Sequence, residues 1–135
     1  MPVLHLEISP AQSPERHLAL AQALTALTVE CLGKRLDVTG VLVDNRTAGC
    51  WYVGAEALRL PTALLEISIT QGTNTADEKS AFIEAAFAEL QRQLGVDGAL
   101  EPASYVIVRE LPAGDWGYGG ITQLGRKRAW ETPDA

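Results

Sequence analysis

The chain contains two copies of one sequence unit, and this internal repeat limits the folds that it can adopt. Residues 2–9 read PVLHLEIS and residues 61–68 read PTALLEIS, an offset of 59 residues. The matches continue in the same order with Gly33 and Gly95, at an offset of 62, and with Trp51 and Trp116, at an offset of 65. We therefore interpret the chain as two units of about 60 residues, with short loop insertions in the second.

Both copies carry the pattern of a strand followed by a helix. The alternation of apolar residues in Pro2–Ser9 and Pro61–Thr70 predicts a half-buried strand at the start of each copy. Ser13 is a suitable N-cap for a first helix that ends at Gly33. In the second copy, residues 75–78 read TADE, a capping box that predicts a helix ending at Gly95. Apolar residues at helical spacing predict the core-facing stripes, which are Leu20, Leu24, Leu27 and Cys31 in the first helix and Ile83, Ala86, Phe87, Leu90 and Leu94 in the second.

A second strand and a glycine-rich aromatic segment complete each copy. We expect these strands at about Val38–Asp44 and Ser104–Arg109, each followed by a tight turn or hairpin. Right-handed β-α-β crossovers then give an α/β (α+β) fold with a four-stranded mixed sheet and both helices on one face. We expect a single domain over residues 1–135, with copies at about 2–58 and 61–125 and a short C-terminal tail. The bare face of such a sheet predicts a homo-oligomer.

Composition excludes several classes of protein. The net charge is −6, and the single basic cluster is Arg126–Arg128, so a nucleic-acid binder is not expected. No apolar run reaches the ~18 residues of a membrane span, and no signal peptide is evident, which predicts a cytoplasmic protein without a membrane partner. Cys31 and Cys50 have no metal-site or disulfide spacing, so we expect no metal and no cofactor.

Pro2 is the residue with the most unusual chemical potential. Methionine ahead of proline is commonly removed, and removal leaves a secondary amine at the start of the first strand. A free α-amino group has a pKa of about 7.7–8.0, and burial disfavours its charged form. An amine that is neutral near physiological pH can act as a general base. The nitrogen of Pro61 is a tertiary amide and cannot.

The combination of these features resembles the tautomerase superfamily, in its fused, double-length 4-oxalocrotonate tautomerase-like form. The resemblance is carried by PVLHLEIS after the initiator methionine, by RELPAGDWGYGG at residues 109–120 and by the two-copy layout. It covers the chain from Pro2 to about Gly125. It implies a homotrimer in which Pro2 is the catalytic base, or the acid in hydratase and dehalogenase members, and in which Pro61 is a structural remnant.

The resemblance also implies further site residues. Gln12 and Gly40 occupy the first-copy positions of the two substrate-binding arginines, and Gln71 and Tyr105 occupy the second-copy positions. The paired arginines of the fused dehalogenases and decarboxylases would fall near residues 70–72, where this chain has none. The bidentate carboxylate clamp is therefore missing, since neither Gln nor Tyr reproduces the arginine fork. Tyr105 becomes a candidate hydrogen-bond donor to the substrate. The other candidates are the pocket aromatics Trp51 and Trp116, the cations Arg46, Arg59 and Arg109, and the auxiliary acids Asp115 and Asp37.

The leading hypothesis is a cofactor-independent tautomerase that moves a proton on a small enol or 2-oxo acid. One alternative is a cofactor-free hydratase or dehalogenase that uses Pro2 as an acid together with Asp115. Another is a non-catalytic oligomeric binding protein that keeps the fold but has lost the substrate arginines. Retention of Met1, which would leave the Pro2 nitrogen an amide, favours this alternative. The missing arginines argue against a dicarboxylate as the natural substrate.

Overall fold

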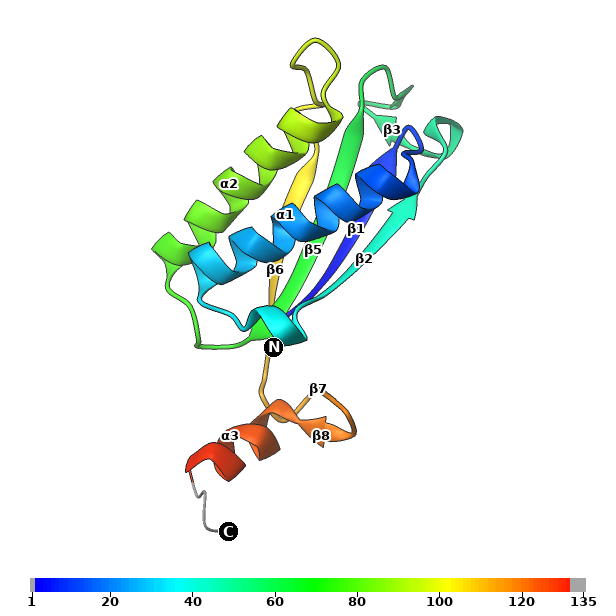
Figure 1. Ribbon diagram of the computed structural model, residues 1–135. Coiled ribbons are helices and arrows are strands. Elements are labelled where there is room, and N and C mark those ends of the chain that lie inside the picture. Colours follow the sequence, from blue (N-terminus) through cyan, green and yellow to red (C-terminus); the bar gives the residue numbers. More distant parts are fainter. Residues whose placement is uncertain (1, 132–135) are drawn as a thin grey trace.

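The computed structural model describes residues 2–131, and its main body is one sheet covered by two helices (Figure 1). The sheet contains β1 (Val3–Ser9), β2 (Gly40–Asn45), β5 (Thr62–Thr70) and β6 (Tyr105–Leu111), in the order β2-β1-β5-β6. Strands β1 and β5 are antiparallel in the centre, and each has its own copy's second strand parallel on its outer side. The expected mixed sheet is confirmed.

Helices α1 (Pro14–Leu32) and α2 (Ala76–Leu94) lie side by side on one face of this sheet, as expected (Figure 1). The Ser13 hydroxyl accepts a hydrogen bond from the N–H of Arg16 at 3.2 Å, which caps α1. Gly33 ends α1 with a φ of 66°, a left-handed conformation that glycine adopts without a Cβ clash. At the start of α2, Thr75 and Glu78 form the expected capping box.

The core lies between the helices and the sheet. The most deeply buried helix positions lie one residue from parts of the expected stripes. Thr28 is fully buried next to Leu27, which packs against the core while partly buried, and Phe82 is fully buried next to the exposed Ile83. Thr28 is tolerated there because its hydroxyl donates to the Leu24 carbonyl at 2.8 Å. The strand side chains at the centre of the core are Leu4, Leu6, Ile8, Ala63, Leu65, Ile67 and Ile69.

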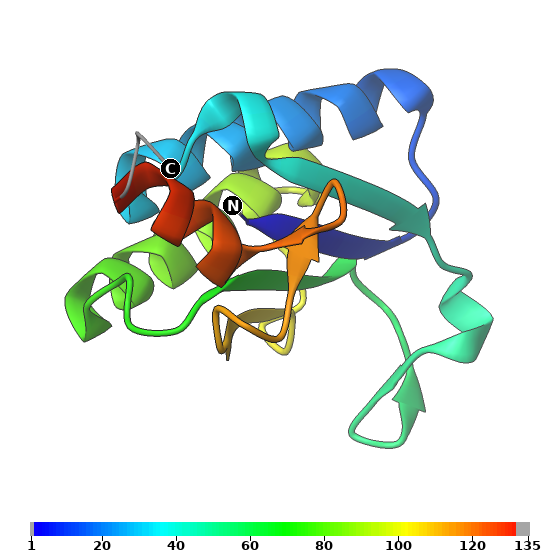
Figure 2. The same cartoon turned by 90° about the horizontal axis from the view of Figure 1, so that it is seen from below.

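Within residues 2–131, no helix covers the opposite face of the sheet, which we call the open face (Figure 2). Val106 and Val108 of β6 pack against the helix-covered core. Val3 and Leu64 have the opposite parity, and Val3 is 49% exposed. The sheet therefore exposes apolar side chains that its own helices cannot cover.

Two short hairpins close the copies, and they lie at opposite ends of the sheet (Figure 1). The first joins β3 (Tyr52–Val53) to β4 (Glu56–Ala57), and the second joins β7 (Gly117–Tyr118) to β8 (Ile121–Thr122). The two-residue turns have positive φ at both positions, 59° and 63° in the first and 62° and 80° in the second. These values are typical of type I′ turns, which match the twist of the strands.

The chain continues beyond the second hairpin as α3 (Gln123–Glu131), so much of the expected tail is helical. Two single-turn 3₁₀ helices, η1 (Leu36–Val38) and η2 (Ala48–Cys50), precede β2 and β3. Among the helices within residues 2–131, none is long and apolar enough to cross a membrane.

Candidate functional site

Pro2 lies directly before β1, at the end of the sheet where β5 and β6 finish. We call this the Pro2 end. The residue is buried, and its carbonyl accepts a hydrogen bond from the N–H of Gly40 at 3.2 Å. Because Val3 pairs with Ser68, continuing the register places Pro2 beside Ile69. Met1, on which the state of the Pro2 nitrogen depends, lies outside the described residues.

Pro61 occupies the equivalent position at the other end of the sheet, the Pro61 end. It is also buried, and its carbonyl accepts the N–H of Glu101 at 2.8 Å. The two copies are thus related by an approximate twofold rotation that exchanges the ends of the sheet. A chain that has lost Met1 has one amine end and one amide end.

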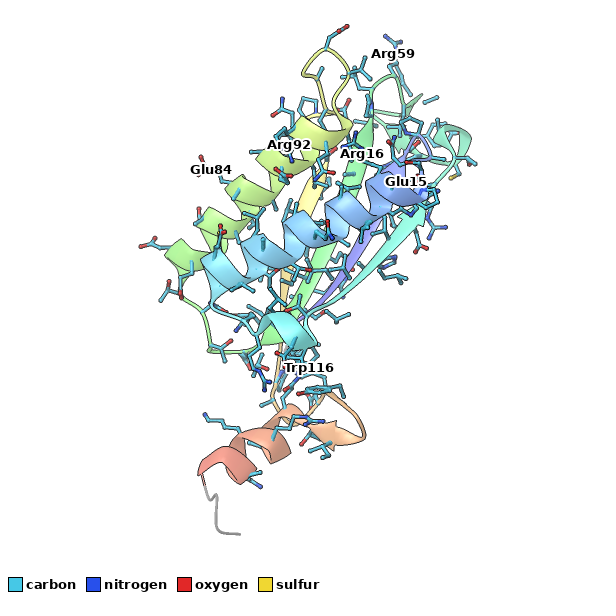
Figure 3. All side chains as sticks on the ribbon, in the orientation of Figure 1. Glu15, Arg16, Arg59, Glu84, Arg92 and Trp116 are labelled. Atoms are coloured by element: carbon cyan, nitrogen blue, oxygen red, sulfur yellow. The ribbon has the colours of Figure 1, made fainter. Side chains whose placement is uncertain are left out.

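The aromatic candidates divide between these ends. Strand β6 leads to Trp116 at the Pro2 end, next to the second hairpin, as Figure 3 shows. Trp51 precedes the first hairpin at the Pro61 end, and Tyr105 lines the same hollow as Trp51. Tyr105 and Leu64 are paired at the level of Glu7, five residues beyond Pro2.

This separation decides which residues one chain can bring together. At about 3.3 Å per residue, Pro2 and Tyr105 are roughly 16 Å apart along the strands. That exceeds two hydrogen-bond lengths, about 6 Å. Within one chain the structure therefore brings Trp116 to the Pro2 end, but not Trp51 or Tyr105.

The register also corrects the equivalence of Gly40 and Tyr105 between the copies. His5 pairs with Leu42 in the first copy, and Leu64, its counterpart 59 residues later, pairs with Tyr105 in the second. Tyr105 is therefore equivalent to Leu42. Matching the copies at their tryptophans misplaces the second strand by two residues, because Leu42 precedes Trp51 by 9 residues and Tyr105 precedes Trp116 by 11.

Lys34 is a cation at the Pro2 end that the sequence analysis did not identify. Its ammonium donates to Thr73 Oγ1 at 2.9 Å, and that hydroxyl donates to the Thr70 carbonyl at 2.6 Å. Thr70 is the last residue of β5 and follows Ile69, the residue beside Pro2. Burial lowers the pKa of Lys34, while the carboxylates of Glu78 and Glu110 act in the opposite direction.

Lys34 thus places a positive charge beside the loop after β5. Residues 70–72 contain none of the arginines that the resemblance places near this loop, whereas Lys34 from the α1–β2 connection reaches the same region. In the sequence, Lys34 could have been noticed because it directly follows Gly33, the residue predicted to end the first helix. The contact itself joins residues 39 apart and is not visible in a local pattern.

The remaining charged candidates at or near the sheet have partners or face solvent. Asp37 lies on η1 and pairs with Arg35 at 2.7 Å. Arg109 lies on the open face and pairs with Glu66 at 3.2 Å. Asp115 is exposed and, together with its neighbour in sequence, lines a hollow of about 230 Å³ beside the second hairpin. Of the two candidate auxiliary acids, Asp115 is the one that shares a hollow with Trp116.

A larger hollow of about 620 Å³ lies at the Pro61 end, between the first hairpin and the open face. We call it the hairpin pocket. Arg46 lies on its rim and donates to Glu7 Oε1 through Nε at 2.9 Å and through Nη2 at 2.6 Å. The third arginine candidate, Arg59, is 82% exposed and pairs with Glu56. The pocket is lined by Glu7, Arg46, Cys50, Trp51, Tyr52, Val53, Gly54, Leu64, Ala103 and Tyr105.

Within residues 2–131, one group of three side chains has metal-ligand geometry. His5, Glu7 and Asp44 on the open face each place one donor atom within 4.8 Å of the others. His5 Nε2 already contacts Asp44 Oδ2 at 2.7 Å, and Glu7 is engaged by Arg46. These contacts describe a polar network on the sheet surface that is satisfied by protein partners.

Comparison with known proteins supports the fold. No protein-family model matches the chain, and no curated protein matches it in sequence. Among solved structures, a fused 4-OT described as a wild-type symmetric trimer has a TM-score of 0.78 and 24% identity, covering 92% of this chain and 98% of that one. A fused 4-OT described as an asymmetric trimer has a TM-score of 0.80 and 23% identity, covering 93% and 99%.

A third structure is of Pt0534 inactivated by 2-oxo-3-pentynoate, with a TM-score of 0.78 and 18% identity, covering 92% of this chain and 98% of that one. The chain therefore has the fold of the tautomerase superfamily. Within that fold, it matches the fused, double-length form over nearly its whole length. The resemblance found in the sequence is confirmed at the level of the fold.

Proposed function

We propose that this protein is a cofactor-independent tautomerase whose Pro2 nitrogen, freed by removal of Met1, is the general base. The observation that carries the proposal is the Pro2 end itself. A buried proline opens the central strand there, and Lys34 and Trp116 come to the same end from two other segments of the chain. The Pro61 end has no such amine.

The proposed reaction is a proton transfer that leaves the substrate's atoms unchanged. The Pro2 nitrogen takes the hydroxyl proton of an enol, the electrons form a carbonyl, and the protonated amine returns a proton to carbon. General base catalysis of this kind is worth about 10²–10⁴-fold. Trp116 supplies an apolar wall, which disfavours the charged form of the amine and keeps it available as a base.

Lys34 gives the substrate one carboxylate contact. A single ammonium binds as a point charge, whereas the arginine fork fixes a carboxylate in two bonds. The proposed substrate is therefore a small 2-oxo acid or its enol with one carboxylate bound, and we expect modest turnover because orientation contributes several kcal/mol to catalysis.

The open face and the trimers formed by fused 4-OT proteins support a homotrimer. In such an assembly, Tyr105 from a neighbouring chain is the proposed hydrogen-bond donor at Pro2. We retain Arg109 and Trp51 as residues of the interface around that donor. Asp115 is the proposed auxiliary acid, since it lines a hollow with Trp116.

Covalent labelling of the amine tests the proposal directly. A free secondary amine adds to the triple bond of 2-oxo-3-pentynoate, whereas an amide nitrogen does not. Intact mass before treatment should show loss of Met1, and peptide mapping afterwards should place one adduct on Pro2. The Cys50→Ser variant serves as a control, because the exposed Cys50 thiol is a competing nucleophile. Retention of Met1, or an adduct confined to Cys50, would overturn the proposal.

Ketonisation of phenylenolpyruvate, followed by ultraviolet absorbance, tests the reaction. We expect slow turnover with a rising pH limb from the amine, reduced in Pro2→Ala and unchanged in Pro61→Ala. If Pro2 is labelled but the enol is not turned over, while a 3-haloacrylate is hydrolysed in a reaction lost in Asp115→Asn, the hydratase or dehalogenase alternative is correct. Ligand binding without either reaction would identify a non-catalytic protein.

A further inference from the structure

Two neighbouring strands, β1 and β2, bring three metal-ligand side chains together on the open face (Figure 1). His5 and Glu7 are two residues apart on β1, so their side chains lie on the same face of the sheet. Asp44 of β2 is paired with Glu7 in the parallel register. One donor atom of each residue lies within 4.8 Å of the other two. We call these three residues the β1–β2 triad, which combines one imidazole nitrogen with two carboxylate oxygens.

The spacing of the triad is close to that of a metal site. Zn²⁺ binds histidine nitrogen and carboxylate oxygen at about 2.0–2.2 Å, so tetrahedral ligand atoms are roughly 3.4 Å apart. His5 Nε2 and Asp44 Oδ2 lie 2.7 Å apart, slightly closer than this. The side chains of His5, Asp44 and Glu7 are 42%, 40% and 23% exposed, which leaves them room to adjust. Small side-chain rotations therefore reach ligand geometry without movement of the strands.

The protein partners of the triad leave it able to bind a cation. Both Arg46 hydrogen bonds to Glu7 go to Oε1, so they leave Oε2 of Glu7 available to a metal. The contact between His5 and Asp44 holds one proton, which a metal ion can replace. A neutral His5 ring moves this proton to Nδ1, and a charged ring releases it to solvent. The two carboxylates and the Arg46 guanidinium together carry one negative charge, which attracts a divalent cation.

The hairpin pocket gives the triad an entry path and space for further ligands. Glu7 belongs both to the triad and to the lining of this pocket, whose volume is about 620 Å³. A metal held by three protein side chains keeps at least one position for water or a small ligand. Such a position needs open space beside it, and the pocket supplies that space on the Glu7 side.

We propose that His5, Glu7 and Asp44 bind one divalent transition-metal ion, through His5 Nε2 and one oxygen of each carboxylate, with water in the remaining positions. Zn²⁺ accepts this mixed set of nitrogen and oxygen ligands, whereas Mg²⁺ prefers oxygen alone. The ion ties the edge strand β2 to the central strand β1. The expectation of no metal rested on cysteine spacing, and this site contains no cysteine. The inference does not rest on the proposed function of Pro2.

Calorimetric titration with ZnCl₂, after dialysis against EDTA, tests the site. Every protein in the series carries Cys50→Ser, because the exposed Cys50 thiol on the hairpin pocket is a competing zinc ligand. We expect one ion per chain. His5→Gln and Asp44→Asn should each weaken binding by more than the roughly 10- to 100-fold that follows loss of a residue supporting a ligand. MgCl₂ should bind far more weakly than ZnCl₂.

Two matched variants separate ligation from general attraction. Glu66 is the neighbour of His5 on β5, and its carboxylate pairs with Arg109 rather than with the triad. Glu66→Gln therefore removes a nearby negative charge without removing a ligand. His17→Gln removes the second histidine, whose ring contacts the Asn45 side chain at 2.9 Å. Both variants should bind zinc nearly as tightly as the parent; a loss in Glu66→Gln equal to that in Asp44→Asn would overturn the inference.

NMR of the histidine ring nitrogens identifies the ligand atom in the protein without a substitution at the site. Zinc should shift the Nε2 resonance of His5 and leave the ring of His17 unchanged. This measurement stays informative if a triad variant unfolds. Lack of zinc binding by the parent protein, equal affinity for magnesium, or an unchanged His5 ring in the presence of zinc would each show that the triad is not a transition-metal site.

Discussion

Gly117→Ala is the most informative single substitution, because it perturbs the second hairpin without touching Pro2. A Cβ at position 117 would lie 2.1 Å from the Ile121 carbonyl oxygen and 2.6 Å from the Thr122 Cα. Both atoms are backbone, so β7 and β8 must separate to admit the methyl group. Forced displacement of this kind costs about 1–3 kcal/mol, which corresponds to a roughly 5- to 150-fold loss in the population of the native hairpin.

The expected result is a local defect with a catalytic consequence. Trp116 directly precedes the hairpin, so we expect altered tryptophan fluorescence and a fall in kcat/KM for phenylenolpyruvate. Amide hydrogen exchange should accelerate in residues 112–131 and stay unchanged in the main sheet. Gly114→Ala is the matched control, since its Cβ would meet only the Leu124 side chain at 3.8 Å. Wild-type activity in Gly117→Ala would refute the role of the hairpin at the Pro2 end.

Three other sets of substitutions test separate parts of the structure. Lys34→Met should raise KM for a 2-oxo acid while Pro2 labelling persists. Since burial keeps the pKa of Lys34 below 10.5, the substrate affinity of the wild-type protein should decline with rising pH before ordinary lysines lose their charge. Thr75→Ala should destabilise the protein by about 1 kcal/mol in urea unfolding. A hydrogen bond from the Thr75 backbone N–H lowers the pKa of Glu78. The stabilisation by this carboxylate, measured as the difference in unfolding free energy between wild type and Glu78→Gln, should be complete above pH 4.5. It should disappear as the pH falls through the lowered pKa. Phe82→Ala should cost about 3–5 kcal/mol by leaving a cavity, whereas Ile83→Ala, at a 38% exposed position, should cost far less; equal losses would contradict the assignment of the core face.

The sequence predicted the architecture well because its strongest patterns are local. Ser13 and Gly33 mark the ends of a helix through bonds to residues a few positions away, and the alternation in residues 2–9 reports one strand's two faces. The repeat then supplied the long-range information, since two similar units must pack in similar ways. The predicted helix stripes contain Leu27 and Phe87, which pack at the edge of the core, but they miss the fully buried Thr28 and Phe82, because apolar spacing cannot show which edge of a broad stripe lies deepest.

The site was less predictable because it depends on register and on loops. Matching the copies by their tryptophans placed Tyr105 opposite Gly40, and only the pairing of strands shows that Leu42 is its counterpart. Lys34 reaches Thr73 across 39 residues, a contact set by where α1 ends and α2 begins in space. The separation of Tyr105 from Pro2 follows from antiparallel pairing between the copies, which the repeat alone does not specify.

The peptide bond at Pro61 has an evolutionary consequence. When identical short chains assemble, every substitution is copied into all active sites, so no site can specialise alone. In a tandem chain the Pro61 nitrogen is an amide and cannot act as a base. Under the proposed function, only the surroundings of Pro2 must therefore be kept for base catalysis, and those of Pro61 are free to diverge. The two ends already differ in this way: Leu42 and Tyr105 occupy equivalent positions with different chemistry, and Lys34 has Val96 as its counterpart one residue after the matching glycine. Fusion thus lets a single gene encode two unlike subunits and adjust each without altering the other.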